Sequence, residues 1–139
     1  MSKDPLLLDT HVWLRCQAST DALRADAEVA IDEAAQRNSV FVSVISIWEL
    51  AMLERARYID LDGGVEKWTQ QALSKPGISL LPFSPEIAID SVHLPAPMHK
   101  DTADRILVAS ARMEGLTLVT SDKAILAFAK LTKLAHLRA

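Results

Sequence analysis

The sequence predicts an α/β protein in which helices cover both faces of a central, mostly parallel sheet of four to five strands. Two observations support this fold class. Short apolar runs of strand length alternate with longer segments of helical periodicity, which is typical of parallel strands joined by right-handed crossovers. The apolar runs are also continuous rather than alternating with polar residues, as expected of strands buried on both faces. A three-layer α/β/α architecture is therefore expected.

Four segments have the length and composition of buried strands. They are residues 5–8, 40–42, 78–81 and 116–120. The last of them is entered through Gly115, which also stands where a glycine commonly ends the preceding helix. These four runs account for the core of the predicted sheet.

Six segments between and after the strands carry apolar residues at helical spacing. They are residues 20–38, 43–57, 64–74, 85–92, 102–114 and 123–130. Ser19 or Thr20 is placed to cap the first of these helices. Ser84 followed by Pro85 is a typical start for the fourth. Each predicted strand is thus followed by a predicted helix.

The length and composition of the chain limit the class of protein. At 139 residues the chain is expected to be one domain, residues 1–139, and its 50% hydrophobic content can supply a substantial core. Cys16 is the lone cysteine, so no internal disulfide is possible. No apolar run approaches the ~18 residues of a membrane span, and none resembles a signal peptide. These features predict a cytoplasmic protein that does not contact a membrane.

The net charge of −3 argues against a surface that binds nucleic acid throughout. It does not argue against an enzyme that holds nucleic acid at one acidic site filled with metal ions, because bound cations make the local field positive.

Two acidic residues directly follow predicted strands. Asp9 follows the first strand and Asp122 follows the fourth. Ligands of open parallel sheets bind at this carboxyl edge, so both are candidate site residues. Each could instead serve only as the N-cap of a following helix, which for Asp9 would begin near His11.

Two more acids lie within predicted helices. Glu49 interrupts residues 43–57, a segment apolar on nearly every side and therefore expected to be mostly buried. A buried carboxylate needs a cation, whether arginine, lysine or a metal ion. Asp104 lies beside an apolar run, and Asp101 three residues earlier is the expected cap of the same helix. Asp104 is thus the better candidate, with Asp101 in reserve.

Four carboxylates gathered at one sheet edge repel each other unless cations or shifted pKa values offset their charges. Ligation by oxygen alone favours Mg²⁺, with Mn²⁺ as a substitute. The candidate metal-binding and catalytic residues are Asp9, Glu49, Asp104 and Asp122.

The segments that contain these acids resemble the four successive motifs of PIN domains. They are LLLDTH (6–11), SVISIWEL (43–50), DTADR (101–105) and TSD (120–122), in the order and at the separations usual for that family. The short chain and the sequence HKDTADR (99–105) resemble VapC-type toxins of VapBC toxin–antitoxin pairs. Thr102 and Ala103 depart from the family, in which a proline and a larger residue are common. This departure is expected to affect the entry of the helix and not the chemistry.

The resemblance implies a PIN-like fold and an Mg²⁺-dependent endoribonuclease that cleaves RNA with a metal-activated water, leaving 5′-phosphate and 3′-hydroxyl ends. It implies that the same four acids are the metal ligands and that the hydroxyls of Thr10, Thr120 and Ser121 steady the cluster or its waters. The partners it implies are RNA, a small inhibitory antitoxin and a second copy of the chain. A PIN-like module that binds RNA or protein without cleavage remains the alternative, although binding alone does not require four convergent carboxylates.

Large apolar residues near the acids have two interpretations. Trp13, Leu50 and Leu53 either belong to the core or form a groove for an amphipathic antitoxin helix.

Basic residues near the acids also have two interpretations. They are either separate solvated charges or together contact RNA phosphates, and they are Arg15, Lys100, Arg105 and Lys123.

Overall fold

The computed structural model describes residues 4–18, 23–95, 98 and 101–139. Its five strands form one fully parallel sheet in the order β3-β2-β1-β4-β5. The strands are β1 (Leu6–Leu8), β2 (Val40–Ser43), β3 (Ile78–Leu81), β4 (Thr117–Thr120) and β5 (His136–Arg138). The predicted α/β class with a parallel sheet is confirmed.

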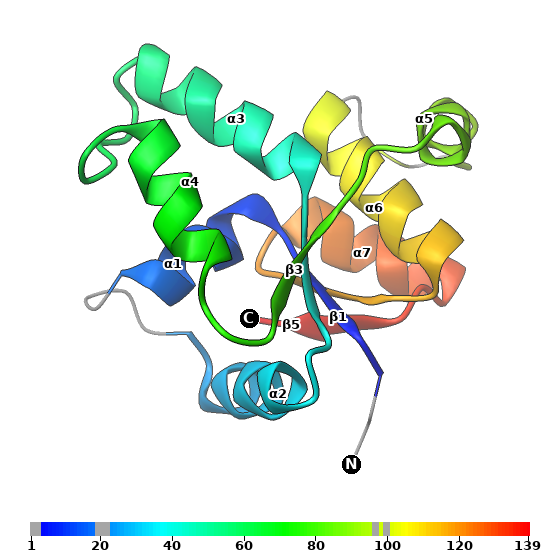
Figure 1. The fold of residues 1–139 in the computed structure, drawn as a ribbon. Coiled ribbons are helices and arrows are strands. Elements are labelled where there is room, and N and C mark those ends of the chain that lie inside the picture. The colour runs from blue at the N-terminus through cyan, green and yellow to red at the C-terminus, as the bar shows by residue number, and fades with distance from the viewer. Residues whose placement is uncertain (1–3, 19–22, 96–97, 99–100) are drawn as a thin grey trace.

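Helices cover both faces of this sheet. Figure 1 shows α5, α6 and α7 on one side and α1, α2 and α4 on the other, while α3 continues from the carboxyl end of β2 across the top of the view. Within the described residues the helices are α1 (Thr10–Gln17), α2 (Ala25–Gln36), α3 (Val44–Arg55), α4 (Val65–Leu73), α5 (Pro85–Val92), α6 (Thr102–Glu114) and α7 (Lys123–Thr132). The structure therefore has the expected three layers.

Side chains of the central strand β1 alternate between two hydrophobic cores. Leu7 packs with residues of α5, α6 and α7, whereas Leu6 and Leu8 pack with residues of α1, α2 and α4. None of the three is more than 6% exposed. The alternation follows from the two-residue repeat of a strand, and burial on both faces explains why the run is apolar at every position.

Three features differ from the sequence prediction or extend it. Helix α1 begins directly after Asp9, as the capping interpretation of that residue required. Strand β5, at residues 136–138, was not predicted, because a three-residue edge strand with a histidine and an arginine lacks the apolar signature. Helix α2 begins at Ala25, and the cap predicted at Ser19 or Thr20 lies outside the described residues.

Helix α3 is less buried than predicted. Only Ile45, Ser46 and Leu50 are buried, whereas Trp48 and Met52 are 48% and 50% exposed. The prediction of a mostly buried helix was wrong because α3 lies across the carboxyl edge of the sheet, where its outer side faces solvent. In the part of the chain that the structure describes, no helix is both long and apolar enough to cross a lipid bilayer.

Candidate active site

The carboxyl edge of the sheet places Asp9 and Asp122 on neighbouring strands. Asp9 follows β1 and caps α1, its Oδ1 accepting a hydrogen bond from the backbone N–H of Val12 at 2.8 Å. Asp122 follows β4 and caps α7, its Oδ1 accepting from the backbone N–H of Ile125 at 2.9 Å. Because β1 and β4 pair directly, both carboxyl groups lie at one edge of the sheet. The capping interpretation is confirmed for both, and each cap uses a single carboxylate oxygen.

Thr120 connects these two acids. Its hydroxyl donates a hydrogen bond to Oδ2 of Asp9 and accepts one from the backbone N–H of Asp122 at 3.0 Å. Asp9 is only 5% exposed, and this burial raises the pKa of its carboxyl group. The hydrogen bonds from Thr120 and Val12 and the charges of His11 and Arg15 oppose that rise. The Asp9 carboxylate is thus held in one orientation by contacts to both of its oxygens.

Glu49 reaches the site on α3, which a buried hydrogen bond ties to α1. The hydroxyl of Thr10 donates to Oγ of Ser46 at 2.8 Å, and Ser46 stands one turn before Glu49. Ser43 begins the helix by accepting from the backbone N–H of Ile45 at 3.1 Å. Glu49 is half-buried. These contacts fix the turn of α3 that carries Glu49 relative to the strand end that carries Asp9.

Asp104 experiences the charge of all the other candidate acids. It lies in the first turn of α6, whose cap is Asp101, as predicted, through a 2.9 Å bond from the backbone N–H of Asp104. Burial raises the pKa of Asp104 to about 7, and repulsion from Asp101, Asp122, Glu49 and Asp9 adds to that rise. The acids on four different segments therefore act on one another electrostatically, and their mutual repulsion favours a bound cation.

The chemistry of these donors fits a divalent metal ion, since they are carboxylate oxygens supported by hydroxyl groups. As the side chains lie, however, no three His, Cys, Asp or Glu residues among those described are arranged to hold a metal ion. Asp9, Glu49, Asp104 and Asp122 are thus close enough for their charges to interact, but their side chains do not converge on one metal position. Their roles as ligands and catalytic groups stay a prediction.

One supporting residue was not predicted, namely Ser46. Its spacing of three from Glu49 on one helix face was the available signal.

The basic residues near the acids differ from one another in what they contact. Arg105 donates to the backbone carbonyls of Ser91, Met98 and Val92 at 2.9, 3.4 and 3.3 Å, so it holds the end of α5. Lys123 is exposed, and Lys100 lies outside the described residues.

The apolar groove predicted from Trp13, Leu50 and Leu53 is not present in that form. Trp13 and Leu50 are fully buried, and the ring of Trp13 packs edge-on against Trp68 with 5.0 Å between centroids. Leu53 is half-buried. The core interpretation, which the sequence left open, is therefore correct for Trp13 and Leu50.

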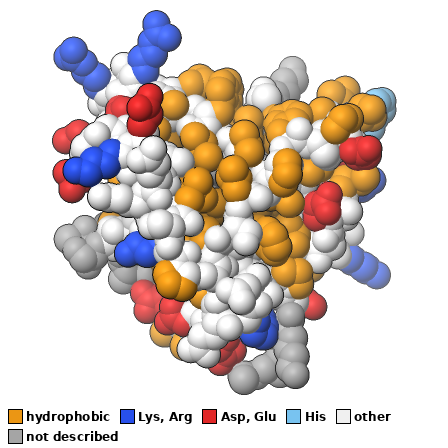
Figure 2. Space-filling model, viewed as in Figure 1, with side chains coloured by type: hydrophobic (Ala, Val, Ile, Leu, Met, Phe, Trp, Pro, Cys, Tyr) orange, Lys and Arg blue, Asp and Glu red, His pale blue; other side chains and the backbone are white. Residues whose placement is uncertain are grey.

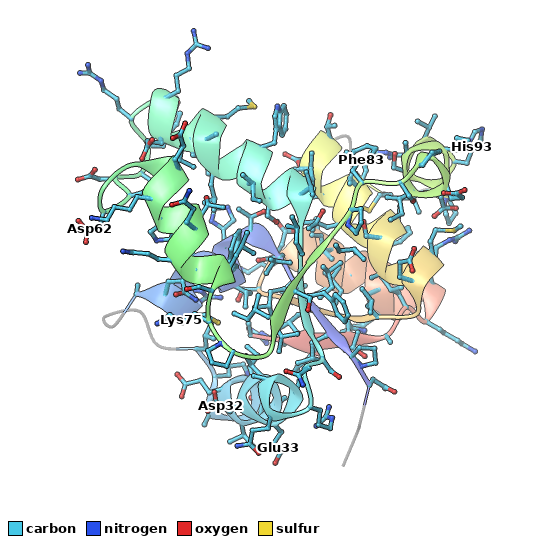
Figure 3. The ribbon with its side chains drawn as sticks, in the orientation of Figure 1. Asp32, Glu33, Asp62, Lys75, Phe83 and His93 are labelled. Carbon is cyan, nitrogen blue, oxygen red and sulfur yellow. The ribbon has the colours of Figure 1, made fainter. Side chains whose placement is uncertain are left out.

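The exposed apolar residues of α3 are instead Val44, Trp48 and Met52, spaced four apart along one side of the helix. We call these three residues the α3 stripe. Figure 2 shows hydrophobic side chains across the middle and upper part of this face of the molecule. Phe83, labelled in Figure 3 between the carboxyl end of β3 and α5, is 42% exposed and adds to that surface.

The fold and the ordered acids define a class of protein. The PIN domain family matches residues 6–132, and the chain belongs to that family. Nucleases of this family generally depend on divalent metal ions.

Among individual proteins, the chain is 34% identical over 118 residues to Ribonuclease VapC22 of Mycobacterium tuberculosis, an alignment that covers 85% of this chain and 87% of the relative. Two solved complexes share the fold at low identity. VapBC2 from Rickettsia felis, bound to a promoter DNA fragment, matches with a TM-score of 0.70 and 16% identity over 96% of this chain and 97% of that one. DNA-bound VapBC from Salmonella typhimurium matches with a TM-score of 0.68 and 14% identity over the same shares, 96% and 97%.

Proposed function

We propose that this protein is a metal-dependent endoribonuclease and the toxin of a VapBC-type toxin–antitoxin pair, with residues 1–139 acting as one PIN domain. The observation that carries the proposal is the gathering of acids at the carboxyl edge of the sheet, where Asp9 and Asp122 follow the paired strands β1 and β4. The pKa of Asp104, which burial and then repulsion from Asp101, Asp122, Glu49 and Asp9 raise to about 7, agrees with that placement. Membership of the PIN family and the similarity to a ribonuclease over most of the chain support it. Because its substrate is cellular RNA, we place its action in the cytoplasm.

The residues proposed to hold Mg²⁺, or Mn²⁺ in its place, are Asp9, Glu49, Asp104 and Asp122. When bound, such a metal lowers the pKa of a water ligand and offsets negative charge on the leaving oxygen of a phosphodiester. The protein's part is to orient the ligands. Thr120 and Val12 hold both oxygens of Asp9, and the bond from Thr10 to Ser46 positions α3 for Glu49.

The direct test is cleavage of a panel of transfer, ribosomal and messenger RNA by the purified protein. Cleavage is expected in Mg²⁺ or Mn²⁺ and not in EDTA, with 5′-phosphate and 3′-hydroxyl ends on the products. Asp9→Asn should retain the fold, because asparagine is also a good N-cap. It should lower the cleavage rate by about 100-fold or more, because an amide binds Mg²⁺ more weakly than a carboxylate. Full activity of this variant after EDTA treatment and return of Mg²⁺ would refute a ligand role for Asp9.

The alternative is a PIN module that binds RNA or protein without cleaving it. The observation in its favour is that no three of the described side chains are arranged around a metal position. Metal-independent RNA binding, together with intact RNA in both Mg²⁺ and Mn²⁺, would support this alternative.

A free ribonuclease damages its own cell, so we propose that a small antitoxin inhibits this protein and that two toxin chains associate in the complex. The acid cluster would attract an arginine or lysine of the antitoxin. The α3 stripe, which flanks Glu49, would supply apolar contact for a partner chain.

The test for these partners is co-expression with an adjacent small reading frame, followed by co-purification, mass measurement and a nuclease assay. Trp48→Asp should leave the monomer folded, because its side chain is 48% exposed, and should weaken the complex. A product that neither binds nor inhibits would refute the toxin–antitoxin assignment and leave the nuclease proposal intact.

A further inference from the structure

Arg15 crosses from α1 to the turn that begins α7. Its Nη2 donates a hydrogen bond to Oγ of Ser121, the residue between Thr120 and Asp122. Ser121 in turn donates to the backbone carbonyl of Ala139 at 3.0 Å. Burial raises the pKa of Asp9, and the positive charge of Arg15 is among the contributions that oppose this rise. The guanidinium therefore lies beside the carboxyl edge of the sheet, within electrostatic reach of Asp9.

Most of the hydrogen-bonding capacity of Arg15 is unused. A guanidinium carries five N–H donors, and this one makes a single hydrogen bond within the described part of the chain. Its Nε is buried there without an acceptor, so the protein itself leaves this donor unpaired. A role limited to tying α1 to Ser121 leaves these donors unexplained.

The other arginine near the acids is used differently. Arg105 has all three of its nitrogen atoms bonded to backbone carbonyls, two at the end of α5 and one at Met98. Arginines away from the site, such as Arg24 and Arg112, pair with Asp26 and Asp90 at 3.3 Å each. Arg15 thus combines nearness to the acid cluster with spare donors.

We propose that Arg15 binds a phosphate group of the RNA backbone next to the acid cluster, with Ser121 as its support. This inference rests on the proposed function. The acids repel the polyanionic substrate, so a cation beside them assists its approach. A guanidinium presents paired donors that match the oxygens of a phosphate, which an ammonium group does not.

The test compares full-length Arg15→Ala and Arg15→Lys with Arg37→Ala. Arg37 is a matched control because it is exposed and lies just before β2, at the opposite edge of the sheet, and its loss changes the net charge equally. Binding of a fluorescent single-stranded RNA is measured by anisotropy over a range of salt concentrations. An Asp104→Asn background for every variant separates binding from cleavage. KM and kcat are then measured with Asp104 restored.

Arg15→Ala is expected to weaken RNA binding about tenfold, as for loss of one charge-assisted hydrogen bond. The slope of log affinity against log salt should fall by about 0.7, the value for one phosphate contact on a single strand. KM should rise more than kcat falls. Arg15→Lys should recover part of the affinity and the full salt slope, because it keeps the charge without the paired donors. Arg37→Ala should change neither quantity.

An unchanged salt slope and KM in Arg15→Ala, with reduced kcat or reduced thermal stability, would overturn the proposal and leave Arg15 as a residue that positions Asp9 and Ser121. If Arg15→Ala does not fold, the Lys variant decides, because a positioning role predicts loss of kcat at wild-type affinity. RNA that is bound with the expected slope change but never cleaved would support the phosphate site and refute the nuclease. Failure of the wild-type protein to bind RNA would overturn both.

Discussion

Replacing Asp104 with asparagine should stabilise the metal-free protein while it abolishes cleavage. Burial, with the charges of Asp101, Asp122, Glu49 and Asp9, raises the pKa of Asp104 from 3.8 to about 7, a shift of roughly three units. At about 1.4 kcal/mol per unit, ionising Asp104 in the folded chain at pH 8 destabilises it by at most ~4 kcal/mol. Partial exposure and salt screening reduce the expected gain in the variant to ~1–2 kcal/mol.

The pH dependence follows from the sign of this shift. Between pH 3.8 and about 7 the folded chain binds more protons at Asp104 than the unfolded chain does. The free energy of unfolding of the wild-type protein therefore falls as pH rises through that window. The stabilising effect of Asp104→Asn should be largest at pH 8 and less than about half as large at pH 5.

The measurement is thermal unfolding in EDTA at both pH values, with Asp62→Asn as a control. Asp62 is exposed and lies in the turn before α4, away from the carboxyl edge in Figure 3. The expected gain corresponds to about 3–6 °C at pH 8. Added Mg²⁺ should stabilise the wild-type protein more than the variant. If Asp104→Asn destabilises the protein at pH 8, or stabilises it equally at both pH values, then burial and the neighbouring carboxylates do not raise the pKa of Asp104 as inferred.

Two further predictions concern packing around the site, and urea unfolding measures both. Ser46→Ala leaves the buried hydroxyl of Thr10 without its partner and should lower the free energy of unfolding by ~1–2 kcal/mol, with the Thr10→Val/Ser46→Ala double variant losing less than the sum of the single changes. Leu50→Ala should lose ~3 kcal/mol because Leu50 is fully buried, whereas Met52→Ala, on the exposed side of the same helix, should lose less than ~1 kcal/mol. Equal losses at the two α3 positions would contradict the orientation of that helix.

The strands and most helices could be predicted because the spacing of their apolar residues along the sequence indicates which positions are buried. Strand β3 and helices α5 and α6 have the predicted bounds, since a cap, a proline or a glycine marks their ends. Periodicity failed where burial depends on the position of an element in the fold. The sequence of α3 is apolar on nearly every side and does not tell which side lies over the core, so the exposure of Trp48 could not be deduced.

The acids of the candidate site could be predicted from their positions relative to strands, because parallel strands end at one edge. Their supporting contacts could not. The hydrogen bond from Thr10 to Ser46 spans 36 residues, and that from Arg15 to Ser121 spans 106. No local pattern relates such distant positions. Taken singly, each of these residues is of a polar type that is common on protein surfaces.

Asp9 and Asp122 serve both as helix caps and as proposed metal ligands. A mutation at either position can therefore remove the ligand alone, or remove the ligand and the cap together. Asparagine caps a helix about as well as aspartate but carries no charge, whereas alanine loses the cap and destabilises the helix by about 1 kcal/mol. A single-base change from aspartate to asparagine can therefore silence the chemistry and preserve the scaffold. Under selection against toxicity, inactive alleles of this gene are expected to encode folded proteins that still compete for the antitoxin, and asparagine at either position is the simplest route to them.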